Sequence, residues 1–259
     1  MARGRKQIEG QLTFEMCLNT EHFVVQSNAL VGGKQALKLN SAKLVRAAIM
    51  QIKPEDQEIL PYKITISELA ELLGVSQSNI YRDINEITDD IIRNPVFIRE
   101  ITEKRIRWVK IPWVAFCTYD SDVGVAIKLN DDLKPFLLNL KEHYTQYELA
   151  EVLAMKSVYA IRIFEMLQEK IKVRHLPDDG MDVEMSVQEI RECCDCEDKY
   201  EKFSHLKSRV IDAAVSEIER TTLYSLTYDY IKKGKTVIGF VFHMKRDWTK
   251  MLKEEKKTG

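Results

Sequence analysis

The chain has 259 residues, of which 45% are hydrophobic, and a formal net charge of −1. At roughly 100–200 residues per domain this length fits one large domain or two ordinary ones, and the apolar share is that of a globular protein. No apolar run approaches the roughly 18 residues of a membrane-spanning helix, and no signal-peptide pattern follows the basic N-terminus. Five cysteines without disulfide-like spacing favour a cytoplasmic location. The balanced charge argues against nucleic-acid binding, for which a basic excess is typical.

Charge is nevertheless segregated along the chain. Between Asp178 and Asp198, nine acidic residues stand against the single basic residue Arg191. Basic residues dominate the segments 99–110, 199–209, 232–235 and 245–259. Such runs are usually solvated faces, so their meaning depends on the elements that carry them.

The segment 39–94 has the pattern of a helix-turn-helix preceded by another helix. Apolar residues recur at helical spacing over 39–50, with Ser41 as a candidate N-cap, and a second helix begins at Ile66. Gly74 can adopt the left-handed conformation that ends a helix, and Ser76 can cap a third helix over about 77–94. Isoleucines form one face of this third helix, and polar residues form the other.

Strand-like runs over 96–101 and 106–116 follow, separated by a charged turn that contains Lys104 and Arg105. A hairpin directly after a helix-turn-helix predicts a winged helix, with this basic cluster on the wing. Pro112 has no N–H for a strand ladder, so we expect a break or a sheet edge there. A third strand is expected over 123–129.

The same order of elements recurs in the second half. The segment 186–190 resembles the start of the first motif, and Cys193 and Cys194 fall where Leu72 and Leu73 fall. An apolar stripe from Phe203 to Ile218 predicts a second recognition helix, and strand-like runs over 223–231 and 236–244 flank a basic turn.

These patterns predict an α+β protein of two tandem winged-helix domains, each a helix-turn-helix followed by a β-hairpin wing. We expect an N-terminal arm over 1–22, a first domain over 23–143, a second domain over 144–246 and a basic tail over 247–259.

Three enzymatic or metal-binding interpretations are weaker. The segment Gly32–Lys34 lacks the spacing of a phosphate-binding loop, so we expect a turn there. Cys193, Cys194 and Cys196 resemble metal ligands, but two of them align with core leucines, which favours buried apolar thiols. The five histidines form no H-x-H pair. The sequence therefore predicts no catalytic residue, metal or cofactor.

The segment SVYAIRIFEML (157–167) resembles the hallmark of the Rep family of iteron-binding plasmid replication initiators. The resemblance continues through the helix that contains Tyr200, Phe203, Lys207, Arg209 and Glu217, and through the hairpin over 232–244. Together the matches cover most of residues 23–246, with the more specific ones in the second half. From the residues alone, the first segment is a helix with Ile161, Phe164 and Leu167 toward a core.

The family resemblance implies that the second domain makes most of the sequence-specific DNA contacts, and the first makes accessory contacts. Side chains near the start of a recognition helix reach base edges, and wings hold the backbone or the minor groove. The residues expected to contact DNA in the second domain are Lys202, Ser204, His205, Lys207, Ser208, Arg209, Lys232, Lys233 and Lys235. In the first domain they are Gln77, Ser78, Asn79, Tyr81, Arg82, Lys104 and Arg105.

The resemblance further implies an initiator that binds directly repeated origin sequences in double-stranded DNA and promotes duplex opening, without nuclease or ATPase activity. The resemblance also implies a homodimer in equilibrium with the monomer, and the dimer represses its own gene by binding an inverted repeat. The implied protein partners are a host initiator and the replicative helicase. The implied location is a bacterial cytoplasm, with a plasmid-borne gene and no membrane association. A dedicated winged-helix repressor is the nearest alternative. An origin-nicking enzyme is disfavoured because its histidine and nucleotide-binding motifs are absent.

Overall fold

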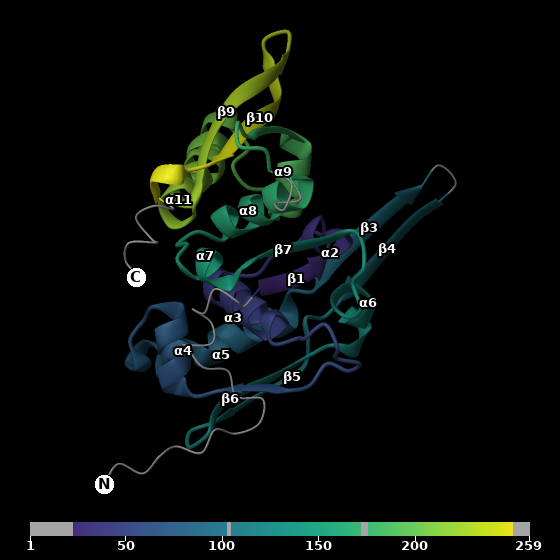
Figure 1. The fold of residues 1–259 in the computed structure, drawn as a ribbon. Helices are drawn as coiled ribbons and strands as arrows, with labels where there is room; N and C mark the ends of the chain where they lie inside the picture. Colours follow the sequence, from purple (N-terminus) through teal and green to yellow (C-terminus); the bar gives the residue numbers. More distant parts are fainter. Residues whose placement is uncertain (1–22, 103–104, 172–175, 251–259) are drawn as a thin grey trace.

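Two three-stranded sheets with the same topology, each joined to a helix-turn-helix, organise the protein. The computed structural model describes residues 23–102, 105–171 and 176–250 (Figure 1). The elements of the first half are β1 (Phe23–Ser27), α2 (Asn28–Val31), α3 (Leu39–Met50), β2 (Tyr62–Ile64), α4 (Ile66–Leu73), α5 (Gln77–Arg93), β3 (Val96–Thr102), β4 (Arg105–Ile111), β5 (Val114–Asp120), β6 (Gly124–Leu129), η1 (Asp131–Leu133) and α6 (Lys134–Leu137). Those of the second half are β7 (Tyr144–Glu148), α7 (Leu149–Leu153), α8 (Val158–Ile171), β8 (Met181–Ser186), α9 (Val187–Cys193), α10 (Phe203–Leu206), η3 (Lys207–Asp212), α11 (Ala213–Thr221), β9 (Tyr224–Lys233) and β10 (Thr236–Arg246).

The first helix-turn-helix is confirmed and consists of α4 and α5. Gly74 has a φ of 67° after α4, and the Ser76 hydroxyl accepts a hydrogen bond from the Asn79 amide at the start of α5. The predicted face of α5, Ile80, Ile84, Ile87 and Ile91, is buried. The expected cap at Ser41 is wrong, because Ser41 lies inside α3 and its hydroxyl donates to the Ile87 carbonyl at 3.3 Å.

The strands after α5 differ from the prediction in their pairing. The expected break at Pro112 is confirmed, since β4 ends at Ile111 and β5 begins at Val114. However, β3 and β4 form a separate two-stranded sheet, to which Lys34 adds a single antiparallel bridge at Phe97, whereas β5 and β6 join β2 in the order β2–β6–β5. The basic segment around Arg105 therefore lies on an additional ribbon. The wing of the sheet itself is the β5–β6 hairpin, in which Asp120 ends β5 and Asp122 lies in the turn.

The second half repeats the sheet in the order β8–β10–β9. Ser186 and Glu189 form a capping box at the start of α9, as Thr65 and Glu68 do at the start of α4. The thiols of Cys193, Cys194 and Cys196 are buried, which confirms their packing role. The recognition helix runs through α10, η3 and α11, and its middle segment η3 is π-helical, which the sequence analysis did not predict.

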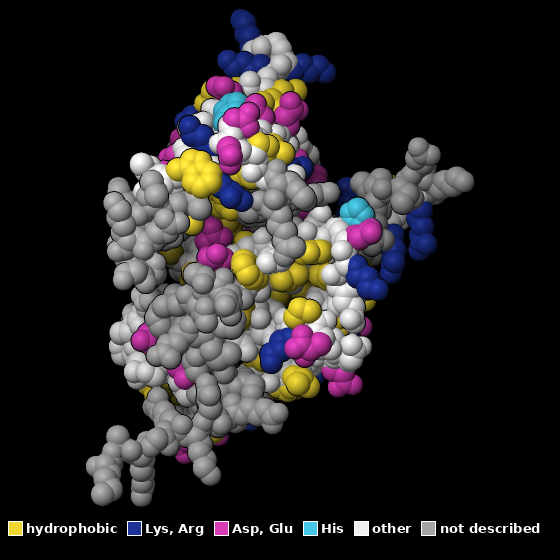
Figure 2. Space-filling view, viewed as in Figure 1, with side chains coloured by type: hydrophobic (Ala, Val, Ile, Leu, Met, Phe, Trp, Pro, Cys, Tyr) yellow, Lys and Arg dark blue, Asp and Glu magenta, His cyan; other side chains and the backbone are white. Residues whose placement is uncertain are grey.

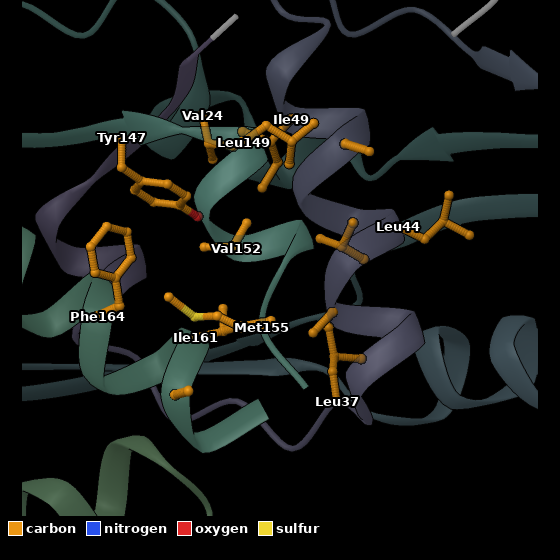
Figure 3. Close-up of a cluster of buried hydrophobic side chains, with 14 of the residues drawn as sticks. Val24, Leu37, Leu44, Ile49, Tyr147, Leu149, Val152, Met155, Ile161 and Phe164 are labelled. Atoms are coloured by element: carbon orange, nitrogen blue, oxygen red, sulfur yellow. The ribbon is translucent and has the colours of Figure 1, made fainter. Parts of the chain in front are cut away.

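A common core lies where the two halves meet. Strand β1 pairs antiparallel with β7, although more than 100 residues separate them. Figure 3 shows Val24 and Tyr147 from these strands facing side chains of α3, α7 and α8, including Ile49, Val152 and Phe164. The predicted inward face of the 157–167 segment is confirmed, since Ile161, Phe164 and Leu167 are fully buried in α8.

A buried carboxylate, that of Glu165 on α8, is the polar centre of this core. Arg46 of α3 donates to both its oxygens at 3.0 Å, and Arg162 makes a second ion pair with it. Tyr147 and Gln26 also donate to it, at 2.5 and 3.1 Å. Burial alone would raise the pKa of Glu165, but the two guanidinium groups and the Tyr147 hydroxyl outweigh burial and lower this pKa to about 2.

Arg162 extends this network toward the second half. Its guanidinium donates to the carbonyls of Val31, the last residue of α2, and of Gly33 in the turn that follows, and to the carbonyl of Cys193 at the end of α9. At the surface nearby, Lys34 pairs with Asp195 and Glu197. The Gly32–Lys34 segment is thus a turn that joins the two halves.

We expect the substitution Glu165→Gln to lower the free energy of unfolding by about 3–5 kcal/mol, because it leaves two buried guanidinium groups without a counter-charge. Urea unfolding followed by circular dichroism measures this loss. Glu71→Gln, at an exposed position on α4, is the matched control and should change stability by less than about 0.5 kcal/mol. Equal losses in the two variants would contradict a special role for Glu165.

The free energies of unfolding of the wild type and of Glu165→Gln should also depend differently on pH. A carboxylate with a lowered pKa stabilises the folded state fully above its unfolded pKa of about 4.3, and this contribution is lost as pH falls toward about 2. Wild type should therefore lose stability relative to Glu165→Gln across this window.

Candidate nucleic-acid interface

The start of the second recognition helix presents a polar, cationic face. Lys202, Ser204, His205, Ser208 and Arg209 are exposed there, as the sequence predicts for a DNA-contacting surface. Within the described part of the chain, Arg209 forms no ion pair. Its guanidinium is therefore available for a bidentate contact such as arginine makes with guanine.

Lys207 lies on the same helix but is engaged within the protein. Its ammonium lies 2.9 and 2.7 Å from the two carboxylate oxygens of Asp212, whose Oδ1 also accepts a hydrogen bond from the Tyr228 hydroxyl at 2.5 Å. The hydrogen bond with Asp212 raises the pKa of Lys207 above its ordinary value. Lys207 thus differs from its exposed neighbours.

The wing of the second half carries a cationic tip. Lys232, Lys233 and Lys235 are exposed around Gly234, whose φ of 63° suits the tight turn between β9 and β10. Figure 2 shows Lys and Arg side chains gathered at the end of this projecting ribbon. The Lys232 ammonium also lies 5.7 Å from the ring centre of Tyr230.

Part of the acidic excess of segment 178–198 is held in ion pairs within the protein. Asp195 and Glu197 pair with Lys34 of the first half, and Glu189 pairs with Lys170 at 2.9 Å. Asp182 on β8 lies 2.6 Å from His243 on β10 and raises the pKa of that imidazole. The sequence does not reveal these pairs, which hold several acidic groups in defined places.

On the first recognition helix, several of the polar side chains expected to contact DNA are engaged in hydrogen bonds within the protein. Gln77 donates to the Ser67 hydroxyl at 3.1 Å, and Ser78 lies 2.9 Å from the Ser76 hydroxyl. The Arg82 guanidinium binds both oxygens of Asp83, which lowers the pKa of that carboxyl. Tyr81 is 52% exposed and projects freely, and Asn79 is half-buried beside the helix start.

The β3–β4 ribbon is the second projecting arm (Figure 1). Arg99, Arg105 and Lys110 are exposed on it, whereas Lys104 lies outside the described residues. Trp108 is 61% exposed, and the Lys110 ammonium lies 5.9 Å from its ring centre. The exposed tryptophan was missed in the sequence analysis, although its position between Arg107 and Lys110 is a basic-aromatic pattern.

The described residues contain neither a cluster of metal-ligating side chains nor a membrane-spanning helix. No three His, Cys, Asp or Glu side chains in this part of the chain gather in a way that would hold a metal ion. None of its helices combines the length and the apolar character needed to cross a bilayer.

Two helix-turn-helix units, each with a three-stranded sheet and a hairpin, define a tandem winged-helix protein. Residues 23–168 match the family described as Initiator Replication protein, WH1, and residues 186–244 match Initiator Rep protein, WH2. The chain therefore belongs to the replication initiator Rep protein family.

A solved structure of a replication initiator shares this fold. The Pi initiator protein, crystallised in complex with iteron DNA, superposes with a TM-score of 0.70 at 19% sequence identity, over 89% of this chain and 99% of that one. The WH1 domain of MSBI1.176, a replication protein isolated from a multiple sclerosis patient, gives a TM-score of 0.29 at 19% identity, over 36% of this chain and 71% of that one. Domains 2 and 3 of RctB give 0.40 at 14% identity, over 81% and 82%. Only the Pi superposition is close enough to establish a shared fold.

Proposed function

We propose that this protein initiates plasmid replication by binding repeated origin sequences in double-stranded DNA and promoting duplex opening. The observation that carries this proposal is the exposed face of the second recognition helix, where Arg209 stands without an ion pair among the described residues, beside a wing tipped by three lysines. Membership of the initiator family and the iteron DNA bound by the similarly folded Pi protein support it.

The contacts divide by chemistry. Arg209, with Ser204, His205 and Ser208 beside it, reads base edges in the major groove. Lys202 and the wing residues Lys232, Lys233 and Lys235 bind phosphates, which position the protein without reading sequence. In the first half, Gln77, Ser78, Asn79, Tyr81 and Arg82 of α5 make accessory contacts, and the ribbon residues Lys104 and Arg105 hold the backbone.

The remaining parts of the proposal concern assembly. A homodimer formed through the first domain represses the protein's own gene, and the monomer acts at the origin with a host initiator and helicase in the bacterial cytoplasm. Strand β5 supports dimerisation, because it is an edge of its sheet and exposes Phe116 and Tyr119, each 42% exposed. The protein supplies binding energy that bends and unwinds DNA, and performs no catalysis itself.

The initiator function is tested with a plasmid that lacks an origin and carries the DNA flanking this gene. We expect it to replicate only when the protein is supplied in trans. Equal replication without the protein would reject initiation and leave a dedicated repressor as the better interpretation. A covalent nick in supercoiled flanking DNA, incubated with the protein and a divalent metal, would instead identify a nicking enzyme.

Arg209→Ala and Lys233→Ala separate base reading from phosphate binding. The probe is a duplex that the wild-type protein enriches from a random-sequence pool, with a scrambled duplex as reference. Arg209→Ala should weaken binding to the enriched duplex by about 1–3 kcal/mol and leave the scrambled one nearly unchanged. Lys233→Ala should weaken both duplexes alike and reduce the salt slope by roughly one unit.

The measurement is fluorescence anisotropy over a range of salt concentrations. Unchanged binding of the enriched duplex by Arg209→Ala would contradict the base-reading role. A sequence-dependent loss in Lys233→Ala would contradict its assignment to phosphate.

A further inference from the structure

The helix that carries Arg209 contains a widened turn. Four fully buried residues, Leu206, Val210, Ala214 and Ile218, recur at every fourth position along α10, η3 and α11. In a straight α-helix of 3.6 residues per turn, each such step would rotate the side chain by roughly 40°. A π-turn closes i to i+5 and takes up an extra residue, so the π-helical η3 keeps all four side chains toward the core.

A side-chain cluster bridges the two ends of this turn. Lys207 and Asp212 are the first and last residues of η3, and their ion pair spans the same interval as a π-helical backbone bond. The Tyr228 hydroxyl, from β9, donates to the same carboxylate, and the Lys207 ammonium lies 5.9 Å from the centre of the Tyr228 ring. Asp212 is therefore held from the helix and from the wing strand together.

Tyr228 is itself fixed by the core of the sheet. Its ring stands edge-on to Phe240, at a centroid distance of 5.4 Å and an angle of 82°, and lies 6.0 Å from Phe242. Both phenylalanines are fully buried. Ser208 and Arg209 lie between the two ends of the bridged turn and are exposed.

We propose that Lys207, Asp212 and Tyr228 form a clamp that fixes the π-turn and so sets the direction in which Arg209 projects toward DNA. Lys207 is then a positioning residue, in place of the direct DNA contact expected from the sequence, because Asp212 already neutralises its charge. Because the ion pair between Lys207 and Asp212 is partly exposed, it adds little to the free energy of unfolding. Its role is to fix the geometry of the π-turn. This inference rests on the proposed DNA-binding function.

Asp212→Asn and Tyr228→Phe test the clamp with the enriched and scrambled duplexes. Each loosens the clamp, and we expect about 3- to 10-fold weaker binding to the enriched duplex, the effect of one hydrogen bond. Binding to the scrambled duplex should change by less than about twofold, because phosphate contacts do not depend on this geometry. Asp212→Asn also removes a negative charge near the proposed interface. Tighter binding to both duplexes would show a purely electrostatic role and overturn the clamp.

Two further variants sharpen the test. Tyr230→Phe is the matched control, because Tyr230 lies on the same strand as Tyr228, and its hydroxyl forms no hydrogen bond with the described residues. It should bind both duplexes as wild type does, and a loss like that of Tyr228→Phe would contradict the clamp.

Lys207→Gln should lower specific affinity without changing the salt slope. A slope reduced by roughly one unit would mean that Lys207 neutralises a phosphate itself.

Non-additivity shows whether the clamp acts through Arg209. In an Arg209→Ala background, Asp212→Asn should cause no further loss of specific affinity, because the side chain that the clamp directs is gone. An additive loss would overturn the inference. If Arg209→Ala alone binds as wild type does, the base-reading assignment fails. If it weakens binding while Asp212→Asn and Tyr228→Phe do not, only the clamp fails.

Discussion

The relation between the two halves depends on one buried carboxylate. Glu165 accepts hydrogen bonds from Arg46 of α3, Tyr147 of β7 and Gln26 of β1, and also from Arg162 of its own helix. Arg162 in turn donates to carbonyls of the first half, at Val31 and Gly33, and of the second half, at Cys193. In a low-dielectric interior, each member of such a network is costly to leave without its partners. The network therefore ties β1, α3, β7, α8 and the end of α9 to one another through a single carboxylate and its partners.

The two halves use the same topology for different surfaces. In the second half, the recognition helix exposes Arg209, and the wing turn carries three lysines. In the first half, Arg82 is bound to Asp83, and the equivalent β5–β6 turn is acidic. In the first half, exposed basic side chains lie on the β3–β4 ribbon instead. A duplex that contacts both halves would therefore meet two differently built surfaces, which supports unequal roles in the proposed DNA binding.

Features set by neighbouring residues could be predicted from the sequence. The Ser76 cap, the left-handed Gly74, the isoleucine face of α5 and the break at Pro112 each depend on a few adjacent positions. Strand pairing depends on distant residues, so the sequence showed neither the β1–β7 pair nor which hairpin joins β2. Arg162 and Glu165 stand within an apolar helix, and only the fold shows that they neutralise each other. The four-residue spacing of the second recognition helix was visible, but a stripe of this kind is also compatible with an ordinary α-helix.

The net charge of −1 is a poor guide to the proposed interface for a physical reason. Charges separated by more than about 8–10 Å in physiological salt are largely screened, so a bound polyanion responds to the charges near it and not to the sum over the chain. Acidic groups of the 178–198 segment are compensated by Lys34 and Lys170, each through a defined ion pair. Arg209 and the wing lysines are not drawn into such pairs among the described residues. A protein can in this way hold a near-neutral total charge, which limits non-specific binding, and still present a locally cationic surface to DNA.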